Sequence, residues 1–411
     1  MNKDIYIYID LLGKTQLVGY LWSRMRKGKE SASFEYDKNW LESPNRFSLE
    51  PALSLGFGAY HTAADKALFG AIGDSAPDRW GRVLMRRAER YRAEKEKRTA
   101  RTLMEADYLL MVNDEAREGA LRFALEPGGP FLGGNNHQTI PPLIELSKLL
   151  SATERITSEE GSEEDLRLLL APGSSLGGAR PKASVRDRNG QLSIAKFPHS
   201  LDETNVVLWE ALALTLAARA KISTPSWRIE KVLGKPVLLL HRFDRVNGNR
   251  IPYLSAMSML DARDNEMRSY LEIVDALRQY GANAEQDIKE LWRRIVFNIL
   301  IANVDDHLRN HGFLYVGGEG WKLSPAFDLN PVPIAIKSRI LSIAINSDDP
   351  TGSIALAMSV ADYFDLNSNE AQAILLEVLK AISEWRKEAK KLGISVEEIE
   401  RMSSAFLMES I

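Results

Sequence analysis

Two carboxylates and one amide in the carboxyl half of the chain have the types and spacing that phosphoryl transfer requires. Asp305 and Asn310 form a D-x-x-x-x-N pattern, and Asp328 follows a hairpin-like segment over residues 312–323. In this chemistry one carboxylate orients a hydroxyl group or accepts its proton. An amide oxygen and a second carboxylate hold Mg²⁺, a cation that prefers oxygen ligands. The pattern predicts Asp305 as the base and Asn310 and Asp328 as metal ligands.

Residues 172–182 form a glycine-rich stretch that is suited to contact phosphates. Its glycines, which include Gly177 and Gly178, let peptide N–H groups converge on an anion. The stretch is not a Walker A loop, because Ala179-Arg180 stands where that loop needs Lys followed by Ser or Thr. On its own, a turn between two strands is the commoner explanation of such glycines.

The elements after this stretch favour the phosphate-binding interpretation. A hairpin predicted over residues 183–197 puts Lys196 on a strand soon after the glycines, where a protein kinase has its phosphate-pairing lysine. A helix predicted over residues 204–220 carries one interior acid, Glu210, which is suited to pair with Lys196 or to face solvent. A buried strand then runs into residues 241–245, where a kinase hinge would offer backbone groups to adenine. A core strand that meets a loop predicts the same local sequence.

The two ends of the chain predict different kinds of structure. The opening residues are rich in β-branched and aromatic side chains and predict a small antiparallel sheet. Apolar residues recur at helical spacing over residues 267–280, 286–302 and 371–391, and Gly393 is a suitable stop for the last helix. The carboxyl half is therefore predicted to be helical, with Asp305 delivered by the end of its second helix.

Composition excludes several classes of protein. The 411 residues exceed one ordinary core and suggest two or three lobes. A net charge of −3 gives no general attraction to nucleic acid or membrane, and the absence of cysteine excludes disulfides, zinc–thiolate sites and thiol catalysis. The sequence has neither a signal peptide nor an apolar run long enough for a membrane span, so a soluble cytoplasmic protein is expected. The basic helix from Arg79 to Arg101 could contact DNA or an acidic partner, although a solvated helix face is favoured.

Three alternatives to a protein kinase stay open. A metal-dependent phosphohydrolase would use Asp305, Asp306 and His307 as a metal cluster, but it leaves the glycine-rich stretch and Lys196 without a role. A small-molecule phosphotransferase of kinase-like fold would use the same residues on another acceptor. A non-catalytic kinase-shaped regulator is disfavoured, because the lysine, the base and both metal ligands are retained. The ordered set of elements favours a phosphotransferase.

Several motifs, taken together and in this order, match a known family. They are Phe34-Glu35-Tyr36, Trp40-Leu41, Asp74-Ser75-Ala76-Pro77-Asp78-Arg79, the stretch 175–182, Arg242-Phe243-Asp244-Arg245, residues 305–310 and residues 323–328. Through them the chain resembles, over nearly its whole length, the HipA-type serine/threonine kinases, which are toxins of bacterial toxin–antitoxin modules. The resemblance implies an α+β, protein-kinase-like two-lobed fold with an added amino-terminal β-rich subdomain and an all-helical carboxyl lobe. The expected parts are residues 1–125, a connector over 126–165, an N-lobe-like part over 166–245 and a catalytic lobe over 246–411.

The resemblance also implies a role for individual residues. Asp305 would be the catalytic base, Asn310 and Asp328 the Mg²⁺ ligands, and Lys196 the contact to the α- and β-phosphates of ATP. The residues implied around the nucleotide are Ser175, Leu176, Gly177, Gly178, Ala179, Lys182, Lys196, Glu210, His241, Phe243, Asp244 and His307. A serine at the start of the loop can be autophosphorylated in this family, which silences the enzyme, and Ser175 or its neighbour Ser174 fits that position.

The chain departs from the family pattern at two places, and the resemblance implies three partners. Arg180-Pro181 replaces a Gln-Glu pair that is familiar in some members, and His241 stands where an acidic residue is common. The implied partners are a HipB-like helix-turn-helix antitoxin, DNA reached indirectly through that antitoxin, and a protein substrate in translation, typically an aminoacyl-tRNA synthetase. No membrane partner is expected.

Overall fold

The computed structural model describes residues 2–131, 140–173, 178, 180–199 and 201–406. The chain divides into two units. Unit 1 holds residues 1–201 and 229–254, and unit 2 holds residues 202–228 and 255–411. The predicted parts 1–125 and 126–165 therefore lie in unit 1, together with most of 166–245, whereas the helix that carries Glu210 lies in unit 2.

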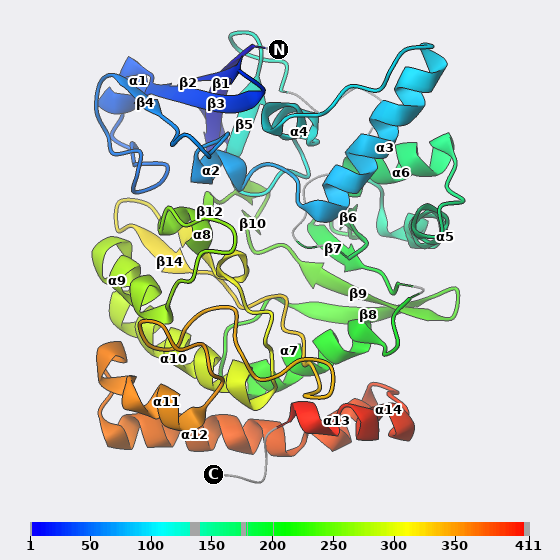
Figure 1. The fold of residues 1–411 in the computed structure, drawn as a ribbon, viewed down its shortest axis with the longest axis vertical. Coiled ribbons are helices and arrows are strands. Elements are labelled where there is room, and N and C mark those ends of the chain that lie inside the picture. Colours follow the sequence, from blue (N-terminus) through cyan, green and yellow to red (C-terminus); the bar gives the residue numbers. More distant parts are fainter. Residues whose placement is uncertain (1, 132–139, 174–177, 179, 200, 407–411) are drawn as a thin grey trace. The chain divides into compact units, whose positions relative to one another are not determined.

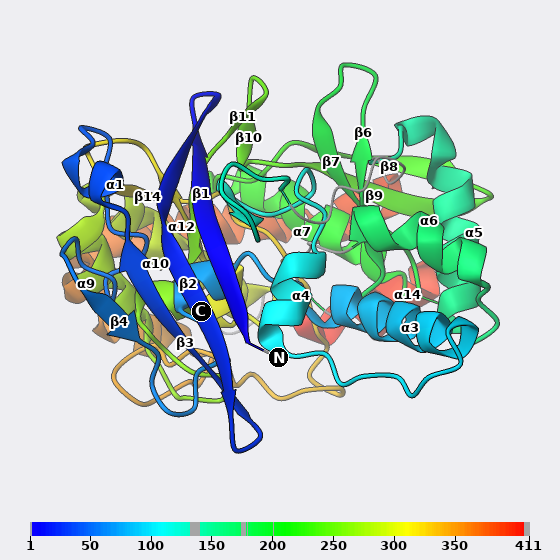
Figure 2. The ribbon, with the colours of Figure 1, turned by 90° about the horizontal axis from the view of Figure 1, so that it is seen from above.

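The predicted opening sheet is confirmed, because side chains in its first strand alternate between the core and the outer face. Ile5, Ile7 and Ile9 are buried, while Tyr6 and Tyr8 between them are partly exposed. The sheet is antiparallel in the order β4-β3-β2-β1-β5 (Figures 1 and 2). Its strands are β1 (Lys3–Leu11), β2 (Lys14–Arg26), β3 (Lys29–Tyr36), β4 (Ala59–His61) and β5 (Leu121–Ala124).

A second antiparallel sheet of unit 1 has the order β6-β7-β9-β8. Its strands are β6 (Lys182–Arg186), β7 (Leu192–Lys196), β8 (Trp227–Val232) and β9 (Lys235–His241), and a short ribbon of β10 (Arg245–Val246) and β11 (Asn249–Arg250) follows. The hairpin predicted over residues 183–197 is thereby confirmed. Buried side chains of this sheet, such as Val185, Ala195 and Leu239, pack in one cluster with Leu84 and Leu149 from two helices.

The helices of unit 1 include the predicted basic helix. They are α1 (Lys38–Glu42), α2 (Gly70–Gly73), α3 (Arg79–Lys95), α4 (Glu105–Met111), α5 (Leu146–Thr157), which the 3₁₀ turn η1 (Leu143–Glu145) precedes, and α6 (Glu163–Gly173). Asp78 caps α3, because its carboxylate accepts the Gly81 N–H at 3.1 Å. The helix stops at Lys95, short of the predicted Arg101. Arg98 and Arg101 both form ion pairs with the buried Glu89, so part of the basic stretch serves internal packing.

Unit 2 is largely helical, and the predicted hairpin of β13 (Gly312–Tyr315) and β14 (Trp321–Leu323) joins the preceding strand, β12 (Tyr253–Ser255), in a three-stranded sheet. The chain enters unit 2 for the second time within β12. The helices are α7 (Val206–Arg219), α8 (Ala256–Met259), α9 (Tyr270–Tyr280), α10 (Ala284–Leu300), α11 (Ile354–Ser359), α12 (Ser368–Ser383), α13 (Trp385–Lys391) and α14 (Val396–Arg401), with 3₁₀ turns η2 (Leu308–Asn310), η3 (Ala361–Phe364) and η4 (Ser403–Ala405).

The helix α10 is the centre of unit 2. Its apolar stripe, for example Ile288, Leu291 and Ile295, is buried, and the helix packs against α9, α11 and α12 (Figure 1). The single helix predicted over residues 371–391 is instead two helices, α12 and α13, which meet at Glu384. Gly393 ends the second of them with φ +81°, as predicted.

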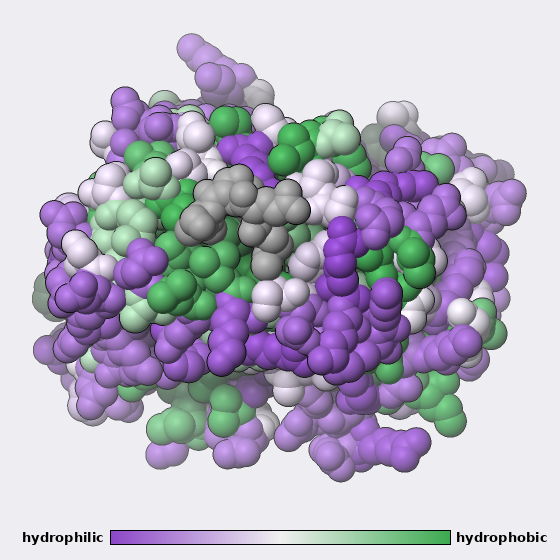
Figure 3. Space-filling view, turned by 90° about the horizontal axis from the view of Figure 1, so that it is seen from below, coloured by the Kyte–Doolittle hydropathy of each residue, from purple (hydrophilic) through white to green (hydrophobic). Residues whose placement is uncertain are grey.

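The surface mixes polar and apolar residues. Figure 3 shows one face, on which hydrophobic patches lie between hydrophilic residues. Among the described residues, none of the helices is both long and apolar enough to cross a bilayer.

Candidate active site

The segment between α10 and β13 gives two neighbouring aspartates opposite surroundings. The side chain of Asp305 is 73% exposed, whereas that of Asp306 is 4% exposed. The chain turns sharply here, with Ala302 in the left-handed region at φ +49°. The Asp305 side chain is therefore accessible from solvent, and Asp306 belongs to the interior.

Asp306 anchors the segment through one oxygen. Its Oδ2 accepts hydrogen bonds from the Tyr270 hydroxyl at 2.5 Å and from Asn298 Nδ2 at 2.9 Å, and it lies 2.8 Å from His311 Nε2. Burial alone would raise the pKa of the Asp306 carboxyl, but the His311 ring and the Tyr270 hydroxyl hold that pKa below its usual value. Asp306 is thus an ionised internal acceptor.

This arrangement argues against the metal-cluster alternative. The carboxylate of Asp306 is already engaged by three side chains. In the part of the chain that the structure describes, no three His, Asp or Glu side chains are placed to hold one metal ion. The segment 305–311 therefore offers an exposed carboxylate on an anchored loop.

A relay of buried amides connects this loop with the segment around Asp328. Asn303 is fully buried, and its Nδ2 donates to Asn298 Oδ1 at 3.0 Å. The Asn303 Oδ1 accepts the backbone N–H of Asn330 at 3.1 Å, and Asn330 Nδ2 donates to the carbonyl oxygen of Asp328 at 3.2 Å. The relay fixes the backbone on the carboxyl side of Asp328, which itself adopts a left-handed φ of +57°.

Asn310 and the Asp328 segment meet at one small cavity. The cavity has a volume of about 10 Å³, and its walls include Asn310 together with Phe327 and Leu329, the two neighbours of Asp328. Asn310 Nδ2 donates to the carbonyl oxygen of Asp305 at 3.2 Å, which leaves the amide oxygen of Asn310 as its ligand atom. An amide oxygen and a carboxylate are hard donors of the kind that Mg²⁺ takes, so these residues fit the predicted ion.

In unit 1, two lysines emerge side by side from neighbouring strands. Lys182 on β6 is the register partner of Lys196 on β7, so their side chains leave the same face with Cβ atoms about 5 Å apart. Lys182 is buried, and its Nζ lies 3.8 Å from Asp78 Oδ2. Ammonium groups are donors that phosphate oxygens accept, so two of them on one face of the sheet suit a phosphate.

Only part of the predicted glycine-rich loop falls in the described chain. Gly178 has a φ of +91°, and its carbonyl oxygen accepts the Trp80 N–H at 3.4 Å. The predicted sites at Ser174, Ser175, Leu176, Gly177 and Ala179 lie outside the described residues.

The predicted hinge begins at the end of β9. His241 pairs in register with Ser193 on β7, and its Nδ1 lies 3.4 Å from Ser193 Oγ. The ring of Phe243 lies 6.4 Å from that of Tyr253. Both Phe243 and His241 are only partly buried, in contrast to Asp244.

The side chain of Asp244 is committed to the interior of unit 1. Its carboxylate accepts bonds from Arg242 at 2.5 Å, from Arg245 at 2.7 Å and from the Gly119 N–H at 2.8 Å. Burial acts to raise the pKa of Asp244, but the two arginines hold that pKa well below its usual range. The backbone of Asp244 is therefore better placed than its side chain to contact a nucleotide.

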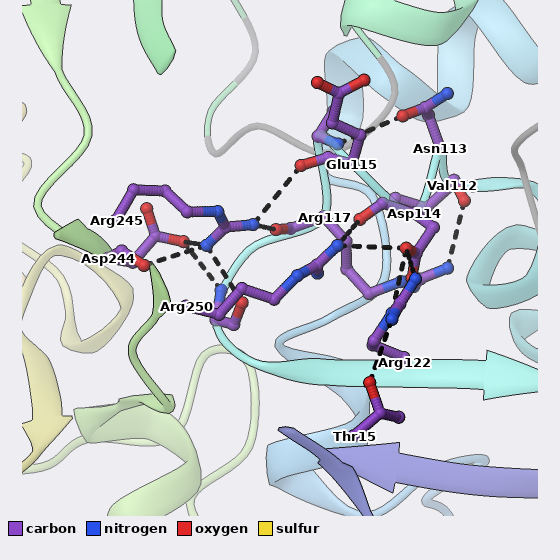
Figure 4. A network of polar contacts seen from close by, with 12 residues as sticks. Thr15, Val112, Asn113, Asp114, Glu115, Arg117, Arg122, Asp244, Arg245 and Arg250 are labelled. Carbon is purple, nitrogen blue, oxygen red and sulfur yellow. Dashed lines mark hydrogen bonds and ion pairs between the residues drawn. The ribbon is translucent and has the colours of Figure 1, made fainter. Parts of the chain in front are cut away.

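The same network ties the hinge to the loop that precedes β5. Arg242 donates to the carbonyl oxygen of Ala116 at 2.5 Å, and Arg245 donates to that of Arg117 at 2.6 Å. Figure 4 shows Arg245 and Arg250 pointing toward this loop, where Arg250 reaches the carboxylate of Asp114. The hinge of unit 1 is thereby joined to the sheet that contains β5.

Glu210, which the sequence suited either to pair with Lys196 or to face solvent, belongs to a different unit from Lys196. Glu210 is buried on α7, so the solvent-facing alternative is wrong, and Lys196 is partly buried at the end of β7. The helix itself is as predicted, and Asn205 caps it by accepting the Leu208 N–H at 3.2 Å. The predicted pairing stays a prediction.

Sequence reasoning missed the residues that hold the loop. Asn298 and Asn303 are polar residues at the end of a strongly apolar helix, and a buried amide on an apolar stripe was an available signal. Tyr270 and Lys337, which lies 3.7 Å from Asp305, carry no pattern that relates them to Asp305 or Asp306.

Comparison with known proteins places the chain in a family. Two family models match it, the HipA N-terminal domain over residues 9–106 and the HipA-like C-terminal domain over residues 174–386. A protein of Haemophilus influenzae that is named as a kinase is 34% identical over 86 residues, which are 20% of this chain and 25% of that protein. Y4mE of Sinorhizobium fredii, also named as a kinase, is 23% identical over 239 residues, which are 51% of this chain and 54% of that protein. The matches thus span about half or less of these curated relatives.

A solved structure agrees over nearly the whole chain. HipA of Shewanella oneidensis, solved in a complex with HipB and operator DNA, superposes with a TM-score of 0.67 at 16% identity. The alignment covers 98% of this chain and 94% of that one, so the fold is shared throughout. With both family models matched in order and the fold shared from end to end, the chain belongs to the HipA family.

Proposed function

We propose that this protein is a serine/threonine protein kinase that transfers the γ-phosphoryl group of Mg-ATP, and that it is the toxin of a toxin–antitoxin module. One observation carries the proposal. The exposed Asp305 and the amide of Asn310 lie on a single loop, anchored by Asp306, and the segment of Asp328 borders the same cavity as Asn310. The family membership and the kinase names of two relatives support it.

Each residue of this loop has a distinct role in the proposed reaction. Asp305 orients the acceptor hydroxyl and takes its proton, for which its exposed carboxylate is suited. Asn310 and Asp328 are the ligands for Mg²⁺, which when bound neutralises charge on the phosphate oxygens. Asp306, Asn298 and Asn303 keep the loop in position without touching the substrate.

The nucleotide contacts of unit 1 are part of the same proposal. Lys196, with Lys182 beside it, pairs with the α- and β-phosphates. The backbone at His241 and Phe243 meets adenine. Ser174 or Ser175 is the site of autophosphorylation, which turns the enzyme off.

The partners follow from the family. HipA of Shewanella oneidensis was solved with HipB and operator DNA. We extend this to a HipB-like helix-turn-helix antitoxin for the present protein, through which DNA is reached, and to a protein substrate of the translation machinery such as an aminoacyl-tRNA synthetase.

Labelled ATP tests the proposal directly. The full chain, incubated with Mg²⁺, γ-labelled ATP and a bacterial extract, should place label on serine or threonine of protein. The variant Asp305→Asn should lower labelling by about 10²–10⁴-fold, as loss of an acid–base group does. It should keep the fold, because the Asp305 side chain is 73% exposed.

Two outcomes would contradict the assignment. Label that enters small molecules but not protein would identify a small-molecule phosphotransferase of kinase-like fold. Labelling by Asp305→Asn at the rate of the unchanged protein would remove Asp305 from the reaction.

A further inference from the structure

Lys337 lies directly beside the candidate base. Its Nζ is 3.7 Å from Asp305 Oδ1, and the two side chains are 47% and 73% exposed. Among the described residues, Lys337 is the one cation that forms an ion pair with Asp305. It belongs to residues 329–353, a stretch without helix or strand that follows Asp328.

The backbone around Lys337 is anchored, so the fold fixes the point from which its side chain extends toward Asp305. The Lys337 N–H donates to the carbonyl oxygen of Pro333 at 3.2 Å and closes a turn. Two residues further on, Arg339 donates to the carbonyl oxygen of Ile299 on α10 at 2.5 Å and to that of Ala405 at 2.9 Å. The turn is thus tied to the same helix that delivers Asp305.

Stability does not explain this contact. An exposed ion pair at this separation contributes little to folding, because solvent screens both charges and two flexible side chains are ordered. A cation beside the base does have a chemical use. The transferred phosphoryl group is negatively charged and must approach the carboxylate of Asp305, which repels it. A neighbouring ammonium group offsets that repulsion.

The other basic groups near the loop are less well placed. Arg309, on the loop itself, is ion-paired with Asp264 at 2.9 Å. The His307 side chain is only partly exposed, and its Nδ1 is buried. Lys337 is therefore the cation best placed to follow the phosphoryl group to the acceptor.

We propose that Lys337 is a further catalytic residue, which pairs with Asp305 in the resting enzyme and with the non-bridging oxygens of the phosphoryl group during transfer. This rests on the proposed kinase function. In the step, the acceptor oxygen forms a bond to the γ-phosphorus while the bond from that phosphorus to the β–γ bridging oxygen breaks. The acceptor proton passes to Asp305, ADP leaves with the bonding electrons, and Lys337 stays protonated throughout.

Two substitutions at Lys337 and one matched control test the inference. Lys337→Met keeps the length of the side chain but removes its charge, and Lys337→Arg keeps the charge. Lys390→Met is the control, because Lys390 is an exposed lysine on α13 for which the described residues provide no ion pair. The readouts are ADP formation from Mg-ATP by the full chain, resolved into kcat and KM, and the shift of its melting temperature with Mg-ATP.

Lys337→Met should lower kcat by roughly 10- to 100-fold, the range seen when one charge-stabilising donor is lost. Its KM for Mg-ATP and its melting shift should stay within about twofold of the unchanged protein. Lys337→Arg should restore most of the rate, and Lys390→Met should match the unchanged protein. A Lys337→Met enzyme with unchanged kcat, or with raised KM alone, would overturn the inference.

The proposed function can fail separately. If Asp305→Asn abolishes ADP formation while Lys337→Met does not change it, the kinase assignment survives and the role of Lys337 is lost. If the unchanged protein, shown by intact-mass measurement to carry no phosphate, neither binds Mg-ATP nor forms ADP, both proposals are contradicted.

Discussion

At the scale of single residues, Asp305 and Asp306 show how two adjacent acids acquire different roles. Asp305 projects into solvent next to Lys337, whereas Asp306 is buried and receives bonds from Tyr270, Asn298 and His311. The sequence pattern could single out Asp305 as a candidate base from its spacing to Asn310, since spacing along the chain is what the pattern records. The pattern could not show that Asp306 anchors the loop, because the partners of Asp306 include Tyr270, which is distant in the sequence.

The substitution Asp306→Asn tests this anchor. It keeps the shape but removes the charge, and it directs an amide group at donors, so we expect the free energy of unfolding to fall by about 1–3 kcal/mol. Urea unfolding at pH 7 measures this. The loop also loses its fixed geometry, and phosphoryl transfer should fall while Mg-ATP still binds.

The difference in the free energy of unfolding between Asp306→Asn and the unchanged protein should depend on pH with a defined sign. The pKa of Asp306 is lower in the folded protein than in the unfolded chain, where it is about 3.9. Its ionised form therefore stabilises the fold above that value, and the contribution is lost as the pH falls through the folded pKa. The difference between Asp306→Asn and the unchanged protein should shrink as the pH falls below about 4. A difference that grows with acidification would contradict the ionised state of Asp306.

At the scale of elements, most helices and strands could be predicted, because each follows from a local period. The strand β1 follows from its alternating isoleucines, and α10 follows from its apolar stripe. The predictions failed where a long-range contact decides. The break between α12 and α13 at Glu384 has no proline or glycine to announce it. The burial of the Asp244 carboxylate was not predicted either. Besides Arg242, its donors include the Gly119 N–H, which lies more than a hundred residues away in sequence.

That network supports a prediction for the element that carries the hinge. Arg242 and Asp244 are both buried, so Arg242→Ala leaves a buried carboxylate and the Ala116 carbonyl short of donors. Removal of one partner of such a pair costs about 3–5 kcal/mol. A matched control is Arg167→Ala, which breaks an exposed pair with Glu163 in the same unit and should cost at most about 0.5 kcal/mol. Urea unfolding of both variants distinguishes them, and equal losses would show that the network does not stabilise the hinge.

At the scale of the whole molecule, one family model matches within unit 1 and the other spans parts of both units, so the family follows from the chain as a whole. The function depends on ligands, and their binding can be measured without a known substrate. A ligand that binds only the folded state stabilises it by RT ln(1 + [L]/Kd), which is about 2.7 kcal/mol at a hundredfold excess over Kd. Mg-ATP should therefore raise the melting temperature by several degrees.

Removal of the metal distinguishes the contribution of the metal ligands to nucleotide binding from that of the rest of the nucleotide site. With EDTA present, ATP should give a smaller shift of the melting temperature than Mg-ATP, because Asn310 and Asp328 act on the phosphates through the ion. In Asp328→Ala, Mg-ATP and metal-free ATP should give similar shifts, whereas Lys390→Met should keep the full difference between them. If the shift with Mg-ATP is the same in Asp328→Ala as in the unchanged protein, Asp328 does not hold the metal. If Mg-ATP gives no shift in the unchanged protein, intact-mass measurement tells an already phosphorylated Ser174 or Ser175 from a protein that does not bind ATP.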